Sequence, residues 1–231
     1  MTVLSDQKET TNRQPDLPAM SKLTRRQFLK HLSVLGGGMV ICFSIGTPSF
    51  SDIRKPLADA KPGQLPDDFN AFLEIGSDNS VTCYTGKAEL GQGVINAIPQ
   101  MIAEELGVAF ESIRLVLGDT DLCPWDMGTF GSMTVRFFGP PVRMAAAKAR
   151  SVLLELASER LNIARKNLET HDGTIFETSN KQNKITYGEL TRGKLIEKQV
   201  TTKPVLTHPM DFSVIGKTYQ REDALDKVTG K

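Results

Sequence analysis

A short loop punctuated by glycine, GKAELGQG at residues 86–93, runs directly into a helical pattern and constrains the fold more than any other stretch. Aliphatic residues then recur at intervals of three, four and four, the spacing of one helix face: Ile95, Ile98, Ile102 and Leu106. Gly107 follows in the usual position after a helix C-terminus. Because proline lacks a backbone N–H, Pro99 requires either the first helical turn or a kink. The pattern predicts a helix between the loop and Gly107.

Three other stretches predict β-strands. FLEI and VTCYTG flank a turn-rich break, so residues 72–86 indicate a β-hairpin. The run IRLVL at residues 113–117 is typical of a buried strand. A second hairpin is indicated by Asp172-Gly173, which lies between the short runs of LETHDGTIFE.

A long glycine-rich loop at residues 118–141 follows the predicted strand. Loops of this length in compact domains are usually functional or disordered, and the aromatic residues of this loop argue against disorder. Pro140 and Pro141 then open a long helix, and residues 186–190 begin a short one. The predicted buried face of the long helix is Val142, Ala145, Ala149, Val152, Leu156 and Leu161. The order of hairpin, loop, helix, strand, loop, helix and hairpin predicts an α+β fold.

The GQG segment of the first loop suits a bound anion. Gly91 and Gly93 can adopt positive φ and let a ligand approach the backbone. The helix N-terminus that follows offers unpaired N–H groups and the positive end of the helix dipole. A plain connection between a strand and a helix explains the same residues equally well. Neither common nucleotide motif fits, because Asn96 occupies the third glycine position of a dinucleotide fingerprint and no Gly-Lys-Ser/Thr follows.

The second loop carries small hydroxyl residues around a glycine, a composition that makes a nest of N–H and O–H donors: Thr129, Gly131, Ser132 and Thr134. Upstream, Asp119 and Asp121 are able to bind a metal or act in acid–base chemistry, although capping a turn is the commoner role of Asp-Thr-Asp. No C-x-x-C pair exists among Cys42, Cys83 and Cys123, so we predict no zinc or iron–sulfur site built from this chain alone.

The N-terminus has the pattern of an export signal. The run TRRQFLK at residues 24–30 meets every position of the twin-arginine pattern, and its defining residues are Arg25, Arg26, Phe28 and Leu29. Mostly apolar residues follow at 32–45, a segment shorter than the roughly 20 residues that a membrane-spanning helix needs. A basic amphipathic helix on a surface fits less well, because the basic and apolar residues form successive blocks. We therefore predict periplasmic export by the twin-arginine translocase, and retention of the signal as an anchor stays open.

The charge distribution supports this organisation. The formal net charge is +1, which gives no basic field of the kind that nucleic-acid binding needs. Positive charge is in excess only near the N-terminus. The predicted division is a disordered n-region with the signal at 1–50, a linker at 51–68, a domain at 69–215 and a junction at 216–231.

Several motifs in order carry a family resemblance. The run G-K-A-E-L-G-Q-G-V, then A-E-E-L-G-V, G-D-T, T-x-G-S-x-T and R-x-A-A-A-x-A-R, resembles the molybdopterin-binding subunit of the xanthine dehydrogenase/aldehyde oxidase family. The branch that it resembles most is the large β subunit of isoquinoline 1-oxidoreductase type. The resemblance covers residues 69–231 and is specific at 86–93 and 129–150. The closing G-K-x-x-x-R-x-D-A-x-x-K-V-T-G resembles the junction into that family's next domain.

The resemblance implies a reaction and its partners. Such proteins hydroxylate carbon next to nitrogen in heteroaromatic rings, or oxidise aldehydes, with water as the oxygen source. Their molybdenum is held by the dithiolene of molybdopterin, in some members as the cytosine dinucleotide, and no protein side chain ligates the metal. Electrons leave through a small subunit with two 2Fe–2S centres, and a cytochrome c is a candidate final acceptor.

The resemblance also implies which residues contact the cofactor. The glutamine of GQG and its glycines do so in the family, and here they are Gly91, Gln92 and Gly93. The T-x-G-S-x-T loop contacts the pterin and its phosphate, and its residues here are Thr129, Gly131, Ser132 and Thr134.

Two parts of the family pattern have no match. The catalytic glutamate of a late glycine-rich motif is missing, and Glu89 is not assigned as the base, so we predict no catalytic residue and no metal ligand. A GGGFG-type cofactor loop is also missing, because residues 36–38 lie in the signal. We therefore expect the N-terminal part of a larger subunit, inactive alone. The alternatives are an exported non-catalytic module for another anion or phosphate, and a non-functional remnant.

Overall fold

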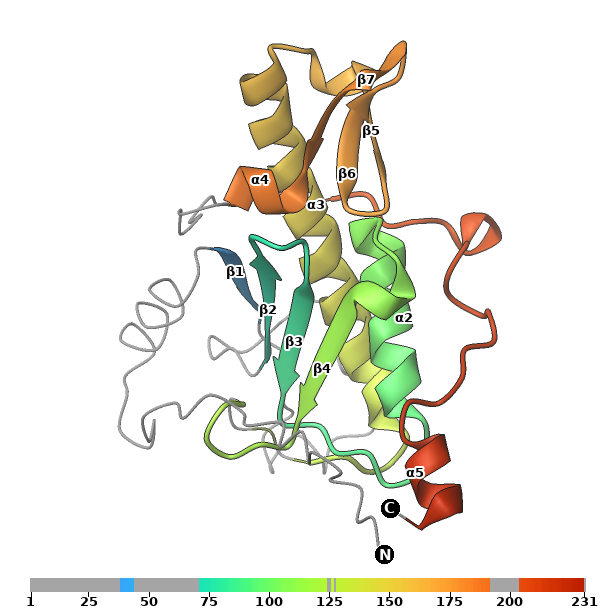
Figure 1. The fold of residues 1–231 in the computed structure, drawn as a ribbon. Helices are drawn as coiled ribbons and strands as arrows, with labels where there is room; N and C mark the ends of the chain where they lie inside the picture. Colours follow the sequence, from blue (N-terminus) through green and yellow to red (C-terminus); the bar gives the residue numbers. More distant parts are fainter. Residues whose placement is uncertain (1–37, 44–70, 124–125, 127, 192–203, 231) are drawn as a thin grey trace, which may run out of the picture.

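The main sheet of the protein has four strands in the order β1-β2-β3-β4 (Figure 1). The computed structural model describes residues 38–43, 71–123, 126, 128–191 and 204–230. The strands are Gly38–Phe43, Ala71–Gly76, Val81–Thr85 and Ile113–Leu117. Strand β2 is antiparallel to both β1 and β3, whereas β4 is parallel to β3.

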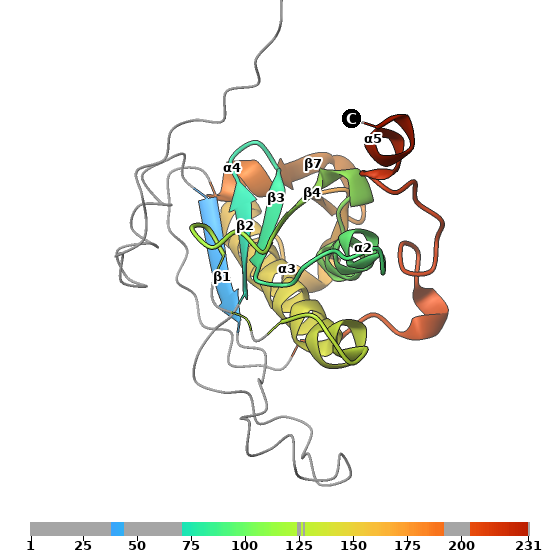
Figure 2. The ribbon, with the colours of Figure 1, turned by 90° about the horizontal axis from the view of Figure 1, so that it is seen from below.

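Two long helices cover one face of this sheet. Helix α2 (Val94–Leu106) connects β3 to β4, as two parallel neighbours require a crossover. Helix α3 (Gly139–Leu161) packs beside α2, and the view from below shows both on the same side of the sheet (Figure 2). Because side chains alternate between the two faces of a strand, every second residue of β2 and β3 points into the core. The fully buried apolar ones are Ala71, Leu73, Ile75, Val81 and Cys83.

Helix α3 begins and ends where its sequence dictates. A π-helical turn, Thr134–Phe138, precedes it, and Pro140 and Pro141 occupy its first turn, where a missing N–H costs nothing. Small side chains let it approach the neighbouring elements closely, and these are Ala145, Ala146 and Ala149. It ends at Asn162, whose φ of 56° is left-handed and whose N–H bonds the carbonyl of Ser158.

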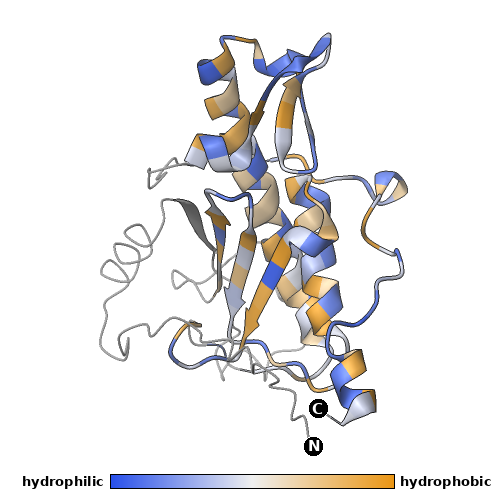
Figure 3. Cartoon of the chain, viewed as in Figure 1, coloured by the Kyte–Doolittle hydropathy of each residue, from blue (hydrophilic) through white to orange (hydrophobic). Residues whose placement is uncertain are grey.

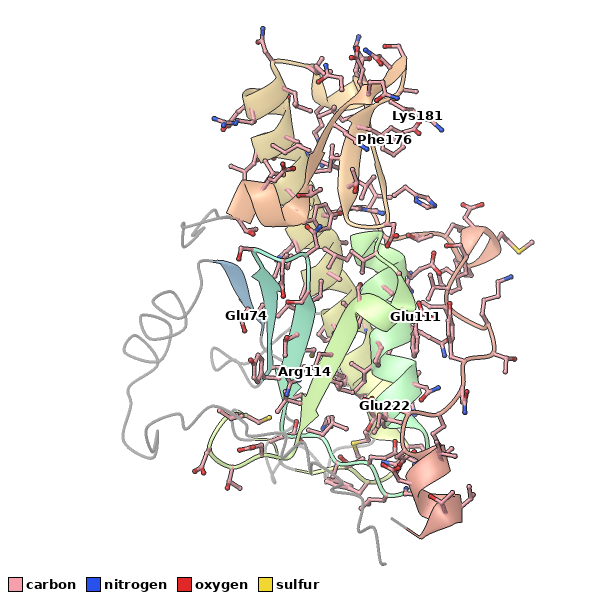
Figure 4. The ribbon with its side chains drawn as sticks, in the orientation of Figure 1. Glu74, Glu111, Arg114, Phe176, Lys181 and Glu222 are labelled. Carbon is pink, nitrogen blue, oxygen red and sulfur yellow. The ribbon has the colours of Figure 1, made fainter. Side chains whose placement is uncertain are left out.

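A second sheet lies at the far end of α3. Its strands β5 (Leu168–His171), β6 (Thr174–Glu177) and β7 (Asn180–Thr186) lead into α4 (Tyr187–Thr191). The fully buried Tyr187 donates its hydroxyl to the carbonyl of Leu106 over 2.6 Å, which ties this sheet to the end of α2. Lys181 lies 5.5 Å from the ring centre of Phe176 on its surface (Figure 4). Figure 3 shows hydrophobic residues along the main sheet and hydrophilic ones at the turn between β6 and β7.

The final described segment returns along α2. Residues 204–223, which we name the strap, follow the outer side of α2 from the second sheet toward the opposite end of the molecule (Figure 1). The strap contains a short 3-10 helix, Pro209–Asp211, and leads into α5 (Ala224–Thr229).

Most elements expected from the sequence are confirmed. Both hairpins, the α2 helix, the long helix and the short helix are present, and the fold is of the α+β class. The strand at 113–117 exists but is not buried, because β4 is an edge strand with Arg114 exposed on its outward face (Figure 4). The loop predicted at 118–141 ends at Met133, because the residues that follow are helical. Pro99 lies beyond the first turn of α2.

Two strands were not expected. Strand β7 extends the second hairpin, and β1 falls within the apolar segment assigned to the export signal. The rest of that signal and the linker at 51–68 lie outside the described residues. Within the part of the chain that the structure describes, no helix is long and apolar enough to cross a membrane.

A very close backbone approach at Gly188 generates a prediction. Its N–H donates to Oδ1 of Asn79 over 2.6 Å, and an added Cβ would lie 2.3 Å from the carbonyl oxygen of Ser77. We expect Gly188→Ala to lower the free energy of unfolding by about 1–3 kcal/mol, measured by chemical denaturation. Gly139→Ala is the matched control: its Cβ would meet only the flexible Met101 side chain, at 3.0 Å. Equal stability of the two variants would contradict this assignment.

Candidate functional site

Two loops meet at one edge of the main sheet. The first, residues 86–93, follows β3, and the second, residues 118–133, follows β4. Because β3 and β4 are parallel neighbours, their carboxyl ends lie at the same edge and both loops start there. The backbone N–H of Ala88 donates to Oγ1 of Thr129 over 2.8 Å. This bond brings a predicted residue of the second loop into direct contact with the first.

Lys87 forms a buried ion pair that also links the two loops. Its Nζ lies 2.8 Å from Oδ1 of Asp126 and donates to the carbonyl of Gly128 over 2.9 Å. The side chains of Lys87 and Asp126 are only 9% and 1% exposed. The ammonium also lies 5.9 Å from the ring centre of Phe138, within cation–π range. Since a buried charge is costly without a partner, these contacts favour one arrangement of the loops.

Asp126 has one satisfied carboxylate oxygen and one unsatisfied. Oδ1 accepts the N–H of Gly128 at 2.8 Å in addition to Lys87. Oδ2 is buried and has no hydrogen-bond partner among the described residues. Buried polar atoms are nearly always paired, so this oxygen is an acceptor available to a donor that the described residues do not supply.

The two glycines of GQG leave the loop backbone open to approach. Gly91 and Gly93 have φ values of 106° and 88°, in the left-handed region that favours glycine. A Cβ built on either residue would meet no atom within 4 Å. The geometry therefore permits the close approach predicted for a ligand, and the contact itself stays a prediction.

The N-terminus of α2 is occupied by a carboxylate from the same loop. Oε1 of Glu89 accepts the N–H groups of Gly91 and Gly93, at 2.7 and 3.1 Å, and Oε2 accepts that of Ile95 at 2.9 Å. The expectation of unpaired N–H groups at this helix end is therefore wrong. Glu89 can fold back onto the helix and supply the negative charge that the dipole favours, so an external anion would have to displace it.

The electrostatics of Glu89 differ from those of a catalytic base. Partial burial opposes its ionisation, but the three backbone N–H groups and Arg221 outweigh this effect and lower its pKa to about 2. Arg221 Nη2 lies 3.1 Å from Oε1 of Glu89. A carboxylate with so low a pKa is a weak proton acceptor near neutral pH.

Gln92 folds back onto its own loop. Its Oε1 accepts the N–H of Leu90 at 2.6 Å, and its Nε2 donates to the carbonyl of Ala88 over 2.9 Å. The residue is exposed, and a glutamine amide has a second N–H and a further lone pair. Gln92 therefore stabilises the loop and retains hydrogen-bonding capacity for a ligand.

The other predicted residues of the second loop lie in different environments. Gly131 and Ser132 are exposed, with φ values of 61° and 55°. Thr134 is 8% exposed and lies in the π-helical turn before α3. Of this predicted group, Thr129 is the member whose hydrogen bond to the first loop is seen in the described part of the chain.

Asp119 caps a turn, which was the commoner of the roles expected for Asp-Thr-Asp. Its Oδ1 accepts the N–H groups of Asp121 and Leu122, at 2.9 and 3.0 Å. This arrangement caps the turn that begins the second loop, as Asp commonly does.

Three contributors to the site were not identified from the sequence: Lys87, Asp126 and Arg221. A signal for Lys87 was present, because the inward alternation of β3 continues through it. Val81, Cys83 and Thr85 are fully buried, and Lys87 occupies the next inward position. A charge at such a position requires a partner, but the identity of that partner depends on tertiary contacts.

Comparisons with known proteins identify the family. The model of the molybdopterin cofactor-binding domain matches residues 19–224. One subunit of the nicotinate dehydrogenase of Pseudomonas putida is 31% identical over 69% of this chain and 13% of its own. The β subunit of isoquinoline 1-oxidoreductase from Brevundimonas diminuta is 29% identical over 94% of this chain and 32% of its own. The crystal structure of quinoline 2-oxidoreductase from Pseudomonas putida 86 is 22% identical over 72% of this chain and 21% of its own, with a TM-score of 0.49.

The chain belongs to the molybdopterin cofactor-binding domain family. Within it, the chain is of the xanthine dehydrogenase/aldehyde oxidase type, and molybdopterin is its cofactor. The chain spans about a third or less of the length of these two curated relatives, at 13% and 32%.

The buried ion pair between the loops provides a test of how they are held together. We expect Lys87→Met to lower the free energy of unfolding by about 3–5 kcal/mol, because it leaves the Asp126 charge buried and unpaired. Adding Asp126→Asn should recover part of the lost stability, because it removes the unpaired charge. The free energies of unfolding of the wild type and of the single and double variants are measured by chemical denaturation. Lys148→Met, at an exposed position of α3, is the matched control and should change little. A Lys87→Met variant as stable as this control would show that the pair does not hold the loops.

Proposed function

We propose that this chain forms one wall of the molybdopterin site in the large subunit of a molybdenum hydroxylase. The observation that carries the proposal is the Ala88–Thr129 hydrogen bond, which joins the two predicted cofactor loops at one sheet edge. The reaction would be the oxidation of N-heteroaromatic compounds or aldehydes, with water as the oxygen source. Relatives named for nicotinate and isoquinoline, both N-heteroaromatic compounds, support this substrate class.

The residues present at the sheet edge fit a pterin cofactor. The open backbone at Gly91 and Gly93 admits a flat group, and the exposed Gln92 amide can bond it. Oδ2 of Asp126, which has no hydrogen-bond partner in the described part of the chain, suits an N–H donor, which a pterin ring carries. The hydroxyl of Thr129 accepts one bond from Ala88 and can still donate its own hydrogen. Molybdenum held by the bound cofactor would supply the oxidation–reduction chemistry, and these side chains would orient the cofactor.

The wider assembly is also proposed. Relatives named as subunits support an enzyme of several chains, and we assign electron transfer to a small subunit with two 2Fe–2S centres. A cytochrome c is the proposed final acceptor. The cofactor is either molybdopterin itself or its cytosine dinucleotide form, and release of cytidine monophosphate on acid hydrolysis of the purified protein would indicate the dinucleotide.

Cofactor content tests the proposed site. We expect Gln92→Ala and Thr129→Val each to lower the bound molybdenum and pterin about threefold to tenfold, because each removes one hydrogen-bonding group. The protein is purified from cells that make molybdopterin, and the metal is measured by mass spectrometry and the pterin by fluorescence. Gln182→Ala, at an exposed position of β7, is the control for the glutamine substitution.

Unchanged cofactor content in both site variants would overturn the proposed site. A folded wild-type protein that binds phosphate but no molybdenum would indicate the anion-binding module instead.

Export is the remaining part of the proposal. We propose that residues 24–30 direct the chain to the twin-arginine translocase and hence to the periplasm, on the strength of the complete TRRQFLK pattern. Arg25→Lys combined with Arg26→Lys should abolish the periplasmic pool and leave the protein in the cytoplasm, measured by cell fractionation. Arg54→Lys, outside the motif, is the matched control. Periplasmic yield equal to wild type in the double variant would contradict the assignment, and release of the protein by osmotic shock would argue against a retained anchor.

A further inference from the structure

The strap is anchored to α2 at its first contact by a buried carboxylate. The side chain of Glu105 is fully buried and accepts the N–H of Thr207 at 3.1 Å and its hydroxyl at 3.2 Å. Arg143 of α3 donates to the same carboxylate over 2.8 Å and to the carbonyl of Thr207 over 2.8 Å. Because one carboxylate bonds both α3 and the strap from its place on α2, this contact fixes where the strap begins.

A row of polar side chains on α2 then holds the strap along its length. Glu104 accepts the N–H groups of Ser213, Val214 and Ile215 at 3.0, 2.7 and 2.9 Å. One turn earlier, Oε1 of Gln100 accepts the N–H of Gly216 at 3.1 Å.

A further turn toward the start of α2, Nδ2 of Asn96 donates to the carbonyl of Tyr219 over 3.2 Å. The ring of Tyr219 also stacks on that of Phe110, with centroids 3.9 Å apart. The polar row on α2 has a spacing of four, which places its members on one helix face: Asn96, Gln100 and Glu104. The strap therefore runs antiparallel to α2 and reaches the glycine loop.

The strap ends on the loop at Arg221. Its Nη2 donates to Oε1 of Glu89 over 3.1 Å, and its Nη1 donates to the carbonyl of Gly91 over 3.2 Å. The guanidinium also pairs with Asp223, which in turn pairs with Lys227 at 2.6 Å. The Glu89 and Arg221 side chains are 10% and 27% exposed, whereas Lys227 at the far end is 59% exposed. These charged groups are therefore partly buried at the loop and exposed at the other end.

We propose that Arg221 is a positioning residue for the glycine loop. It acts through Glu89, whose carboxylate organises the N–H groups of Gly91, Gly93 and Ile95, and through the carbonyl of Gly91. The strap is therefore a structural part of the site, and its docking on α2 sets the shape of the loop. The relevance of this role to cofactor binding rests on the proposed function.

Amide hydrogen exchange in the complete chain tests the role of Arg221. We expect Arg221→Met to speed exchange at Gly91, Gly93 and Ile95 about fivefold, because the charge that holds Glu89 is lost. Exchange in the second half of α2 should stay at the wild-type rate, which shows that the domain is folded. Arg221→Lys should restore part of the protection, since a lysine can still pair with Glu89. Lys227→Met, which removes only the outermost ion pair, is the matched control and should leave the loop amides unchanged.

A double variant separates positioning from a merely structural contact. In a Glu89→Gln background, Arg221→Met should have a much smaller effect on loop exchange than it has in the wild type. Wild-type loop exchange in Arg221→Met, failure of Arg221→Lys to restore protection, or effects that simply add with Glu89→Gln would each overturn the proposal.

The experiments distinguish failure of the positioning role of Arg221 from failure of the proposed cofactor site. If Arg221→Met loosens the loop while molybdenum content in Gln92→Ala and Thr129→Val stays normal, the positioning role stands and the cofactor role of the loop falls. If those two variants lose molybdenum while Arg221→Met leaves loop exchange unchanged, the reverse conclusion follows.

Discussion

Strands β3 and β4 are parallel neighbours, and α2 is the crossover between them. Two glycine-containing loops therefore begin at the same edge of the sheet. The Ala88–Thr129 and Lys87–Asp126 contacts are possible only because of this pairing, since they join residues 41 and 39 positions apart. The same crossover lays α2 along the sheet with one face in the core and another toward the strap. Both the site and the strap therefore depend on one topological constraint.

Three charged groups with reduced exposure link segments that are distant in the sequence. Glu105 joins α2 to the strap and to α3, Glu104 joins α2 to the strap, and Lys87 joins the first loop to the second. Burial of a carboxylate is costly, and here backbone N–H groups offset much of that cost. For Glu104, burial opposes ionisation, but the N–H groups of Ile215, Val214 and Ser213 lower its pKa. An apolar contact could hold the strap equally well but would not fix its register, because it lacks directional bonds.

The sequence was sufficient at two places where one or two residues determine the backbone conformation. The turn at Asp172-Gly173 and the end of α2 at Gly107 both depend on positive φ, which residue identity determines within a few positions. Burial of β4 was misjudged because an apolar run does not reveal whether a further strand covers its edge. The open helix N-terminus was misjudged because Glu89 folds back on it. The partner of Lys87 and the role of Arg221, 132 positions from Glu89, depend on tertiary folding that no local pattern encodes.

Because Glu89 occupies the N-terminus of α2, the two loops offer different groups to a ligand. Glu89 uses the N–H groups that the helix would otherwise offer to an anion, so the first loop presents open glycine backbone and the Gln92 amide rather than a positive pocket. Besides the second N–H of Gln92, donors for a negatively charged group are available on the second loop, where the Thr129 hydroxyl retains its hydrogen and Ser132 is exposed. On this reasoning the first loop suits the flat, neutral part of a cofactor, whereas the second loop offers hydroxyl donors to its phosphate and the Asp126 carboxylate to an N–H of its ring.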